Sequence, residues 1–407
     1  MAYTSSDIRN VCLVGPSNAG KTQLAEALLH AGGAISECGS IEKGTTVSDY
    51  TPREKQLGHS QYAAVCHLDH GGIHVNLIDT PGYRDFIGRG LSVLPSVETA
   101  ALVINAQDGV DMICRRMMDA AKAQRLCRMI IINKIDAEEL NLEQLLADIR
   151  EAFGQGCLPL NLPSADGSSV VDCFFTPENV PTMFSDVDTA HTQIVDQVVE
   201  VDEELMEVYL EQGQELQPEQ LHDPFEKSLR EGHLIPVCFV SAKTGSGIKQ
   251  LLHIFEELMP NPMEGNPPRF LKGEGEDAEE VTISPDPDAH AIAHVFMVNI
   301  DPFKGRLGTF RIHQGTIRPG NQLFVGDARK PIKVNQLLKI NGGEHIKATI
   351  GVPGDICAIP RVDEVFYDAV LHDSHDEDHF HLKSIDLPRP MYGLAIKPPS
   401  DNDAQKT

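Results

Sequence analysis

The sequence predicts an α/β domain built on a mostly parallel sheet and carrying an inserted α+β subdomain, followed by an all-β barrel domain. Three observations predict this fold. Apolar strand patterns alternate with helical patterns as far as residue 262, which is typical of a parallel sheet covered by helices. The alternation is interrupted between about 154 and 234, and after 262 short strands separated by turns replace the helices.

A strand, a loop and a helix begin the chain. Residues 8–14 (IRNVCLV) form an apolar run typical of a buried strand, and KTQLAEALLHA (21–31) has a helical pattern. The same alternation predicts further strands and helices, the strands at 74–79, 100–106, 129–133 and 234–242 and the helices at 112–125, 137–153 and 247–259.

The interruption is expected to hold the inserted subdomain. Short strand-like pieces, CLPLNL and SVVDCFF, precede helices expected around 189–212 and 217–231. From Asp188 to Glu226 there are many acids and no Lys or Arg. We favour a solvated acidic helical face over the alternative, a docking surface selected for its charge.

The second half of the fold follows a polar segment at 273–280. The turn sequences DPFKG, IRPGN, NGGE and GVPGD recur at spacings expected of a small all-β barrel. The predicted domains are therefore 1–262, which contains the insertion, and 263–388. A last strand-like run, PMYGLAIKPP, predicts the start of a third domain at 389–407.

The composition is that of an ordinary globular chain, and it excludes several classes of protein. The formal charge of −26 opposes non-specific binding to nucleic acid, so any RNA-bearing partner must be met through local patches, and no sequence-specific nucleic-acid partner is expected. The nine cysteines are scattered and never spaced CxxC, which predicts reduced thiols rather than disulfides or a zinc site. With no signal peptide and no apolar stretch near the roughly 20 residues of a membrane span, we expect a cytoplasmic chain without a membrane partner.

The strongest motif is GPSNAGKT (15–22), which fits GxxxxGK[ST] and lies between an expected strand and an expected helix, as this phosphate-binding motif requires. Backbone N–H groups would cradle phosphates at the helix N-terminus, Lys21 would reach the β- and γ-phosphates, and Thr22 would bind Mg²⁺. The alternative, a chance glycine loop, is much weaker in this context. The residues expected to bind nucleotide here are Gly15, Asn18, Ala19, Gly20, Lys21 and Thr22.

A second phosphate-site motif, DTPGYRDF (79–86), follows another expected strand. Asp79 would hold Mg²⁺ directly or through water, and the N–H of Gly82 would meet the γ-phosphate. Tyr83 would then lie beside the terminal phosphate. The candidate catalytic residues are therefore Tyr83, Lys21 and Gly82.

Two more motifs, NKID (133–136) and SAK (241–243), follow expected strands in the order and position of the base-recognition loops of GTPases. Asp136 would accept hydrogen bonds from guanine N1–H and the exocyclic amine, which adenine cannot offer, and the backbone at Ala242 would contact O6. Each tripeptide is weak alone, but with GKT and DTPG they predict guanine-nucleotide binding. The residues expected to form the base pocket are Asn133, Lys134, Asp136, Ser241, Ala242 and Lys243.

Together these motifs resemble the translational GTPases. The long gap between NKID and SAK resembles the inserted subdomain of elongation factor G, and DPFKGRLGTFRIHQGTIRPGNQL (301–323) is similar to the strand pair that begins its barrel. PMYGLAIKPP is similar to the first strand of the domain that follows there. The resemblance implies GTP and GDP as ligands, Mg²⁺ as cofactor, and a monomer that binds the ribosome, including its stalk region.

The chain departs from the family pattern in three motifs. Where the family usually has RGIT, with the Thr on Mg²⁺, LGHS (57–60) places Ser60, which keeps the hydroxyl. Asn18 replaces an aspartate of the phosphate loop, and Tyr83 replaces the histidine that helps to place the attacking water. These departures indicate an elongation-factor-G-like paralogue, of a subgroup with tyrosine at this position. The metal ligands implied are Thr22, Ser60 and Asp79.

The implied function is hydrolysis of GTP to GDP as a conformational switch, slow in the absence of ribosomes. The Tyr83 hydroxyl can orient water by hydrogen bonding, or the ring can swing away and pack on an apolar wall, and both alternatives stay open. A GTP-dependent binding module with little hydrolysis is the competing class. A GTPase that acts outside translation is a third and weaker interpretation.

One further stretch, HDSHDEDHFHL (372–382), gathers histidines among acids. The spacing of His372, His375, His379 and His381 matches no fixed ligand geometry, and the stretch lies where the last strands of the barrel are expected. We therefore favour a solvated loop or sheet edge over a metal site.

Overall fold

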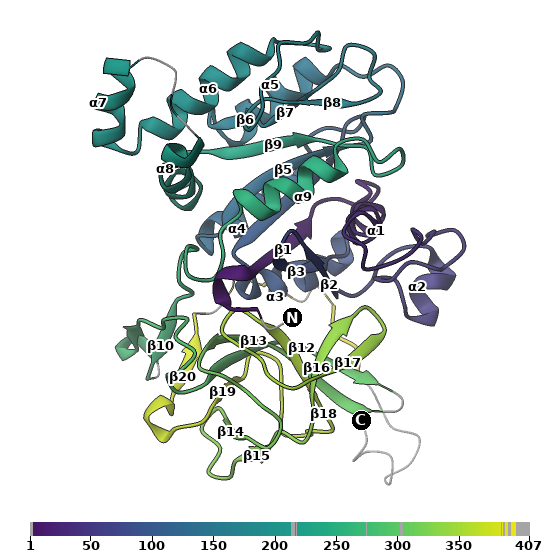
Figure 1. Cartoon of the computed structure of the whole chain (residues 1–407). Helices are drawn as coiled ribbons and strands as arrows, with labels where there is room; N and C mark the ends of the chain where they lie inside the picture. The colour runs from purple at the N-terminus through teal and green to yellow at the C-terminus, as the bar shows by residue number, and fades with distance from the viewer. Residues whose placement is uncertain are drawn as a thin grey trace.

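The computed structural model describes residues 3–212, 216, 218–273, 275–301, 304–383, 385, 387–389 and 392–395. Figure 1 shows an α/β part above a strand-rich part, with the chain passing from the first to the second after α9. The helices of the insertion lie at the end of the α/β part that is farthest from the strand-rich part.

A seven-stranded sheet forms the centre of the α/β part. Its strands are parallel except β2, which a two-residue turn at Gly71 and Gly72 joins to β3 in antiparallel register. The mostly parallel sheet predicted from the sequence is confirmed. In spatial order the strands are β2 (Ala64–His70), β3 (Ile73–Asp79), β1 (Ile8–Val14), β4 (Thr99–Asn105), β5 (Cys127–Asn133), β9 (Ile235–Phe239) and β6 (Cys157–Pro159).

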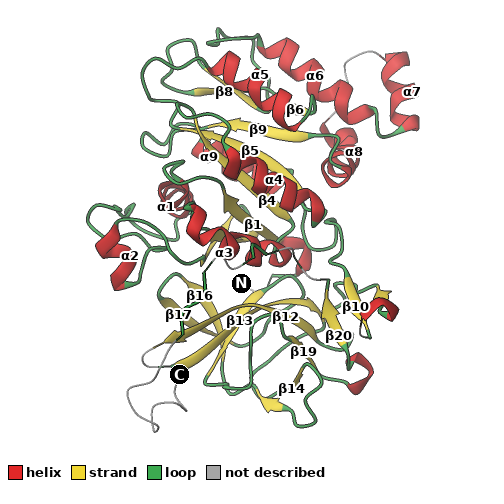
Figure 2. Ribbon diagram, turned by 180° about the vertical axis from the view of Figure 1, so that it is seen from behind, coloured by secondary structure: helices red, strands yellow, loops and turns green. Residues whose placement is uncertain are grey.

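Helices cover both faces of this sheet, α1 and α9 on the side facing the viewer in Figure 1 and α3 and α4 on the side facing the viewer in Figure 2. They bury apolar side chains spaced three or four residues apart, as Ile113, Met117 and Ala121 of α4 do. The helices are α1 (Lys21–Ala31), α2 (Pro52–Leu57), α3 (Ile87–Val93), α4 (Met112–Ala123), α5 (Leu142–Phe153), α6 (Val187–Val199), α7 (Glu203–Gln212), α8 (Pro218–Glu231) and α9 (Ile248–Glu257).

Two of these helices differ from the sequence predictions, for reasons of capping. The helix expected from residue 137 begins at Leu142, because the side chain of Asn141 accepts a hydrogen bond from the Gln144 N–H at 3.1 Å. The single helix expected at 189–212 is two helices, because the Asp202 side chain accepts from the Leu205 N–H at 3.0 Å and starts α7 anew. A hairpin of β7 (Asn161–Pro163) and β8 (Val170–Asp172) completes the insertion.

The strand-rich part is antiparallel, as predicted for a barrel. An eight-stranded sheet curls around its own apolar core, and a three-stranded sheet lies beside it. The larger sheet has the order β15 (Ile332–Lys333), β14 (Gln322–Val325), β19 (Val370–His372), β12 (Ile292–Asp301), β13 (Gly305–Gln314), β18 (Ile356–Pro360), β16 (Leu337–Asn341), β17 (Glu344–Ala348). The smaller has the order β11 (Glu279–Val281), β10 (Phe270–Lys272), β20 (Phe380–Leu382).

Buried polar contacts join the two parts. Arg311 of β13 pairs with Glu98, just before β4, and the other carboxylate oxygen of Glu98 accepts from Asn10 of β1 at 2.8 Å. At a second point the β16–β17 hairpin meets β2, where the Gly342 N–H donates to the carbonyl oxygen of Val65 at 2.8 Å. The barrel therefore covers part of the sheet edge formed by β2.

The histidine-rich stretch is built into the barrel. His372 is buried in β19, and its two ring nitrogens lie 2.7 Å and 2.8 Å from carbonyl oxygens of Ser374 and Gly326. His375 and His379 are exposed and pair with nearby aspartates. The third-domain strand expected in PMYGLAIKPP falls largely outside the described residues. No helix in the described part of the chain is both long and apolar enough to cross a membrane.

Candidate functional site

The phosphate loop joins β1 to α1 at the carboxyl edge of the sheet. Gly15 has a φ of +134°, and a Cβ atom there would lie 2.4 Å from the carbonyl oxygen of Val103. Gly20 has a φ of +85°, and a Cβ atom there would lie 2.5 Å from Nδ2 of Asn133. Glycine is needed at both positions, because the backbone is left-handed and its neighbours are close. The N–H groups at the start of α1 are thereby turned toward any anion held in the loop.

Lys21, the first residue of α1, is buried and bends back over the loop. Its Nζ donates to the carbonyl oxygens of Gly15 at 2.9 Å and Pro16 at 2.7 Å, and burial lowers its pKa to about 8. Gly82 lies beside it, since its carbonyl oxygen accepts from the Ser17 N–H at 3.0 Å and a Cβ atom on it would be 2.5 Å from the Lys21 Nζ. The structure therefore brings Lys21 and Gly82 together at the phosphate loop.

Hydroxyl groups from three segments gather near Asp79, which is buried at the end of β3, and two of them donate to it. Its Oδ2 accepts from Oγ1 of Thr22 at 2.7 Å and from Oγ of Ser48 at 2.8 Å. The Oγ of Ser60 lies 3.1 Å from Oγ1 of Thr22. Burial raises the pKa of Asp79. The three metal ligands implied by the sequence, Thr22, Ser60 and Asp79, thus form one cluster.

Asp49 adds a second carboxylate to this cluster. Burial, followed by the charge of Asp79, raises its pKa to about 7. Oδ1 of Asp79 is buried without a hydrogen-bond partner among the described residues, and the hydroxyl of Ser60 is the group that favours the charged form of the buried Asp49 carboxylate. Unpaired buried carboxylates are costly, and carboxylate and hydroxyl oxygens are the ligands that hard divalent cations prefer. The donor set therefore fits a cation such as Mg²⁺.

Neither Ser48 nor Asp49 was predicted from the sequence. They lie in a polar loop between α1 and α2, in no motif that marks them. One buried glutamate holds this loop, and another holds the segment after α2 that carries Ser60. Glu26 of α1 accepts from the N–H groups of Gly39 at 2.7 Å and Val47 at 2.6 Å, and Glu54 of α2 accepts from those of Gln61 and Tyr62.

The base-recognition candidates form a connected group at the ends of β5 and β9. Asn133 donates through Nδ2 to the carbonyl oxygen of Ala19 at 2.9 Å and accepts through Oδ1 from the Ala242 N–H at 3.0 Å. Ser241 donates to Oδ1 of Asp136 at 2.6 Å. Lys134 has a φ of +68°, and Nζ of Lys243 lies 3.6 Å from Oδ2 of Asp136. Asn133 therefore links the phosphate loop to the loop that carries SAK.

Tyr83 lies at the surface just after Gly82. Its side chain is 41% exposed, and its ring centroid is 4.5 Å from that of His59. The hydroxyl has no hydrogen-bond partner among the residues that the structure describes. The ring contacts the segment that carries Ser60, so Tyr83 joins the two loops that border the cation cluster.

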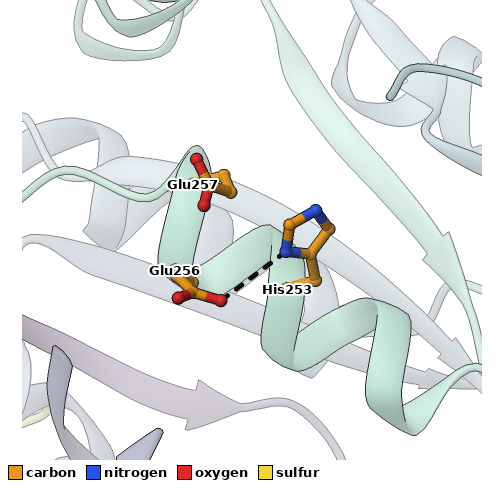
Figure 3. Close-up of side chains that lie close together, drawn as sticks. All are labelled: His253, Glu256 and Glu257. Atoms are coloured by element: carbon orange, nitrogen blue, oxygen red, sulfur yellow. Dashed lines mark ion pairs between the residues drawn. The ribbon is translucent and has the colours of Figure 1, made fainter. Parts of the chain in front are cut away.

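Among the described His, Cys, Asp and Glu side chains, one group of three has ligand atoms close enough to hold a metal, and it lies on α9, not in the histidine-rich stretch. Figure 3 shows His253 and Glu256 facing one another on this helix with Glu257 beside them. Nδ1 of His253 is 3.6 Å from Oε2 of Glu256. His253 and Glu257 are exposed, and groups of this kind are common on helix surfaces without a metal, so we assign no function to it.

Two family models match this chain. The elongation factor Tu GTP binding domain matches residues 6–261, and elongation factor G domain 2 matches residues 290–368. The first match alone covers more than half of the chain.

Individual relatives match almost the whole chain. An elongation factor G-like protein of Mycobacterium tuberculosis is 32% identical over 98% of this chain and 59% of its own length. Elongation factor G of Mycoplasma pneumoniae is 29% identical over 98% and 60%. A crystal structure of a protein from Thermus thermophilus aligns with a TM-score of 0.82 and 28% identity, over 98% of this chain and 59% of that one. The chain thus spans about three-fifths of the length of these relatives.

Proposed function

This chain belongs to the translational GTPases, in their elongation-factor-G-like group, and on that premise we propose that it binds GTP with Mg²⁺ and hydrolyses it to GDP as a conformational switch. The observation that carries the proposal is the cluster beside the phosphate loop. There Thr22, Ser60 and Asp79 meet at hydrogen-bond distances next to the buried ammonium of Lys21.

In the proposed reaction Thr22, Ser60 and Asp79 would hold Mg²⁺, and the buried carboxylate of Asp49 lies beside them. The bound ion supplies positive charge against the β- and γ-phosphates. Lys21 and the N–H groups of the phosphate loop hold the phosphates, and the N–H of Gly82 donates to the γ-phosphate. Tyr83 orients the attacking water through its hydroxyl, which can both donate and accept a hydrogen bond.

The guanine base is proposed to lie against NKID and SAK. Asp136 accepts from N1–H and the exocyclic amine, and the backbone at Ala242 contacts O6. The contacts of Asn133 with Ala19 and Ala242 support this proposal, because they hold the base-recognition loops in register with the phosphate loop. Gly15, Asn18 and Gly20 shape that loop, and Lys134, Ser241 and Lys243 border the base pocket.

The proposed partner is the ribosome, including its stalk region, and the protein is proposed to act as a cytoplasmic monomer with slow turnover in the absence of ribosomes. We also propose residues 1–262 as the nucleotide domain, with the insertion at about 154–234, and 263–388 as the barrel domain. The matches to elongation factor G support both proposals. A binding module with little hydrolysis is the second candidate, and the exposure of Tyr83 favours it.

The Asp136→Asn variant tests the proposed ligand. An amide in place of the carboxylate turns a donor toward guanine N1–H, and a buried polar group left unpaired costs about 1–3 kcal/mol. We expect preference to shift from GTP toward xanthosine triphosphate in competition binding measurements. Glu138→Gln removes an exposed acid from the same loop and should keep the preference of the parent. If Asp136→Asn prefers GTP as strongly as the parent does, Asp136 does not recognise the base.

A further inference from the structure

One hairpin of the barrel reaches the cation side of the nucleotide site. The turn formed by Gly342 and Gly343 joins β16 to β17 and lies against residues Val47 to Tyr50. This segment, which we call the cation loop, carries Ser48 and Asp49. The barrel thus contacts the residues on either side of two groups in the cation cluster, although the barrel itself supplies no side chain to that cluster.

The contact is close enough to require glycine. A Cβ atom on Gly342 would lie 2.0 Å from the carbonyl oxygen of Val47, and one on Gly343 would lie 3.2 Å from the ring of Tyr50. Gly342 also has a φ of +57°, which the turn itself requires. Gly326, in another barrel turn, has a similar φ of +51° but nothing within 4 Å of its Cβ position. The crowding at Gly342 therefore comes from the cation loop and not from the left-handed turn conformation itself.

The cation loop is held from its other side as well. The N–H of Val47 donates to Oε1 of Glu26 at 2.6 Å. Helix α1 therefore contacts the N–H group of Val47, and the barrel turn lies against its carbonyl group. The next side chain, Ser48, donates to Asp79 at 2.8 Å, and the one after it, Asp49, is buried beside Asp79. A displacement of Val47 away from the barrel would move both Ser48 and Asp49 relative to Asp79.

We propose that the turn at Gly342 and Gly343 is a positioning element for the cation site. It sets the cation loop so that Ser48 and Asp49 face Asp79, and it makes the barrel part of the apparatus that gives the site its affinity for Mg²⁺. This inference rests on the proposed function as a Mg²⁺-dependent GTPase. The base pocket lies outside it, because Asn133 and Asp136 make their hydrogen bonds to the phosphate loop and to the loop after β9.

The test is the Mg²⁺ requirement for GTP binding by the whole chain, measured with a fluorescent GTP analogue during MgCl₂ titration. In Gly342→Ala the new methyl group must displace Val47, so the half-saturating Mg²⁺ concentration should rise about 10-fold, the lower end of what lost outer support costs a metal site. GDP binding in the presence of EDTA should stay at the parent value, which a general loss of folding would not allow.

Two variants of matched chemistry accompany it. Gly326→Ala carries the same left-handed strain without the contact and should keep the Mg²⁺ requirement of the parent. Gly343→Ala lies at a backbone without positive φ and only crowds the ring of Tyr50, so its requirement should rise less than that of Gly342→Ala. If Gly342→Ala does not fold, the Mg²⁺ requirement of Gly343→Ala tests the inference in its place.

The inference is overturned if Gly342→Ala keeps the parent Mg²⁺ requirement, or if Gly326→Ala raises it equally. If Gly342→Ala does not fold, the inference is overturned when Gly343→Ala keeps the Mg²⁺ requirement of the parent. A parent chain that binds GTP equally well with MgCl₂ and with EDTA would instead refute the proposed Mg²⁺ site, and the inference with it. A parent that binds no guanine nucleotide at all would refute the proposed function.

Discussion

Tyr83 orients the attacking water in the proposed mechanism, and its surroundings make its hydroxyl separable from its ring. The ring contacts His59, whereas the hydroxyl has no partner among the described residues. Tyr83→Phe should therefore keep the packing and remove only the group that orients water. We expect single-turnover GTP hydrolysis to slow by about 10²-fold, the lower end of positioned proton-transfer effects. Tyr83→His should equal or exceed the parent.

These rates are to be compared at matched nucleotide occupancy, with and without ribosomes. Equal rates for the parent and Tyr83→Phe would remove the hydroxyl from the mechanism. If the parent also hydrolyses no faster on ribosomes, the binding module with little hydrolysis becomes the better description.

For individual residues, the sequence was informative wherever the function fixes the spacing of residues within a motif. Lys21, Thr22, Asp79 and Asn133 stand in motifs, so their neighbourhood could be anticipated. Asp49 could not, because its role arises from burial beside Asp79 across 30 positions of sequence, and a single aspartate in a polar loop carries no periodic or spacing signal.

At the scale of elements, the loop between α1 and α2 depends on one buried carboxylate. Glu26 accepts from the N–H groups of Gly39 and Val47, and hydrogen bonds to charged groups contribute about 1.5–3 kcal/mol each. Glu26→Gln places an amide N–H group against one of these donors. Amide hydrogen exchange at Gly39 and Val47 should then quicken by at least about tenfold, because 1.4 kcal/mol corresponds to a factor of ten.

Glu42→Gln is the control, since it neutralises an exposed acid of the same loop. Exchange in Glu26→Gln no faster than in this control would show that other contacts hold the loop.

The long elements could be predicted because burial dictates their periodicity, as in β1, β4 and α4. The missed ones were α2, β2 and α3. β2 mixes histidines and an aspartate with apolar residues, because half of it faces a second domain through His67 rather than the core. α2 has six residues and owes its start to the Thr51–Glu54 capping box, while α3 contains two glycines that weaken any helical pattern.

For the whole molecule, the Glu98–Arg311 pair couples the two domains. Both side chains are buried, and Glu98 also accepts from Asn10. Glu98→Ala leaves the guanidinium of Arg311 buried without its counter-charge, which costs about 3–5 kcal/mol when a buried pair is broken. We expect a lower calorimetric Tm and a transition that separates into two, one for each domain.

The double variant Glu98→Leu with Arg311→Leu should recover much of this loss, because no uncompensated charge remains. A loss below about 1 kcal/mol in Glu98→Ala would mean that water already solvates the pair and that it does not couple the domains. This interface could not be predicted from the sequence, since Glu98 and Arg311 are 213 positions apart and no sequence pattern pairs them.

The position of β2 at the edge of the sheet bears on self-association through strand pairing. β2 is an outermost strand of the seven-stranded sheet, and the barrel hairpin occupies part of its free side, through Gly342 on Val65 and the Ile340 carbonyl on His67. Uncovered strand edges offer rows of unpaired N–H and C=O groups to other chains. The barrel therefore also shields part of this strand edge. An α/β domain expressed without the barrel would expose β2 for pairing with β2 of another copy.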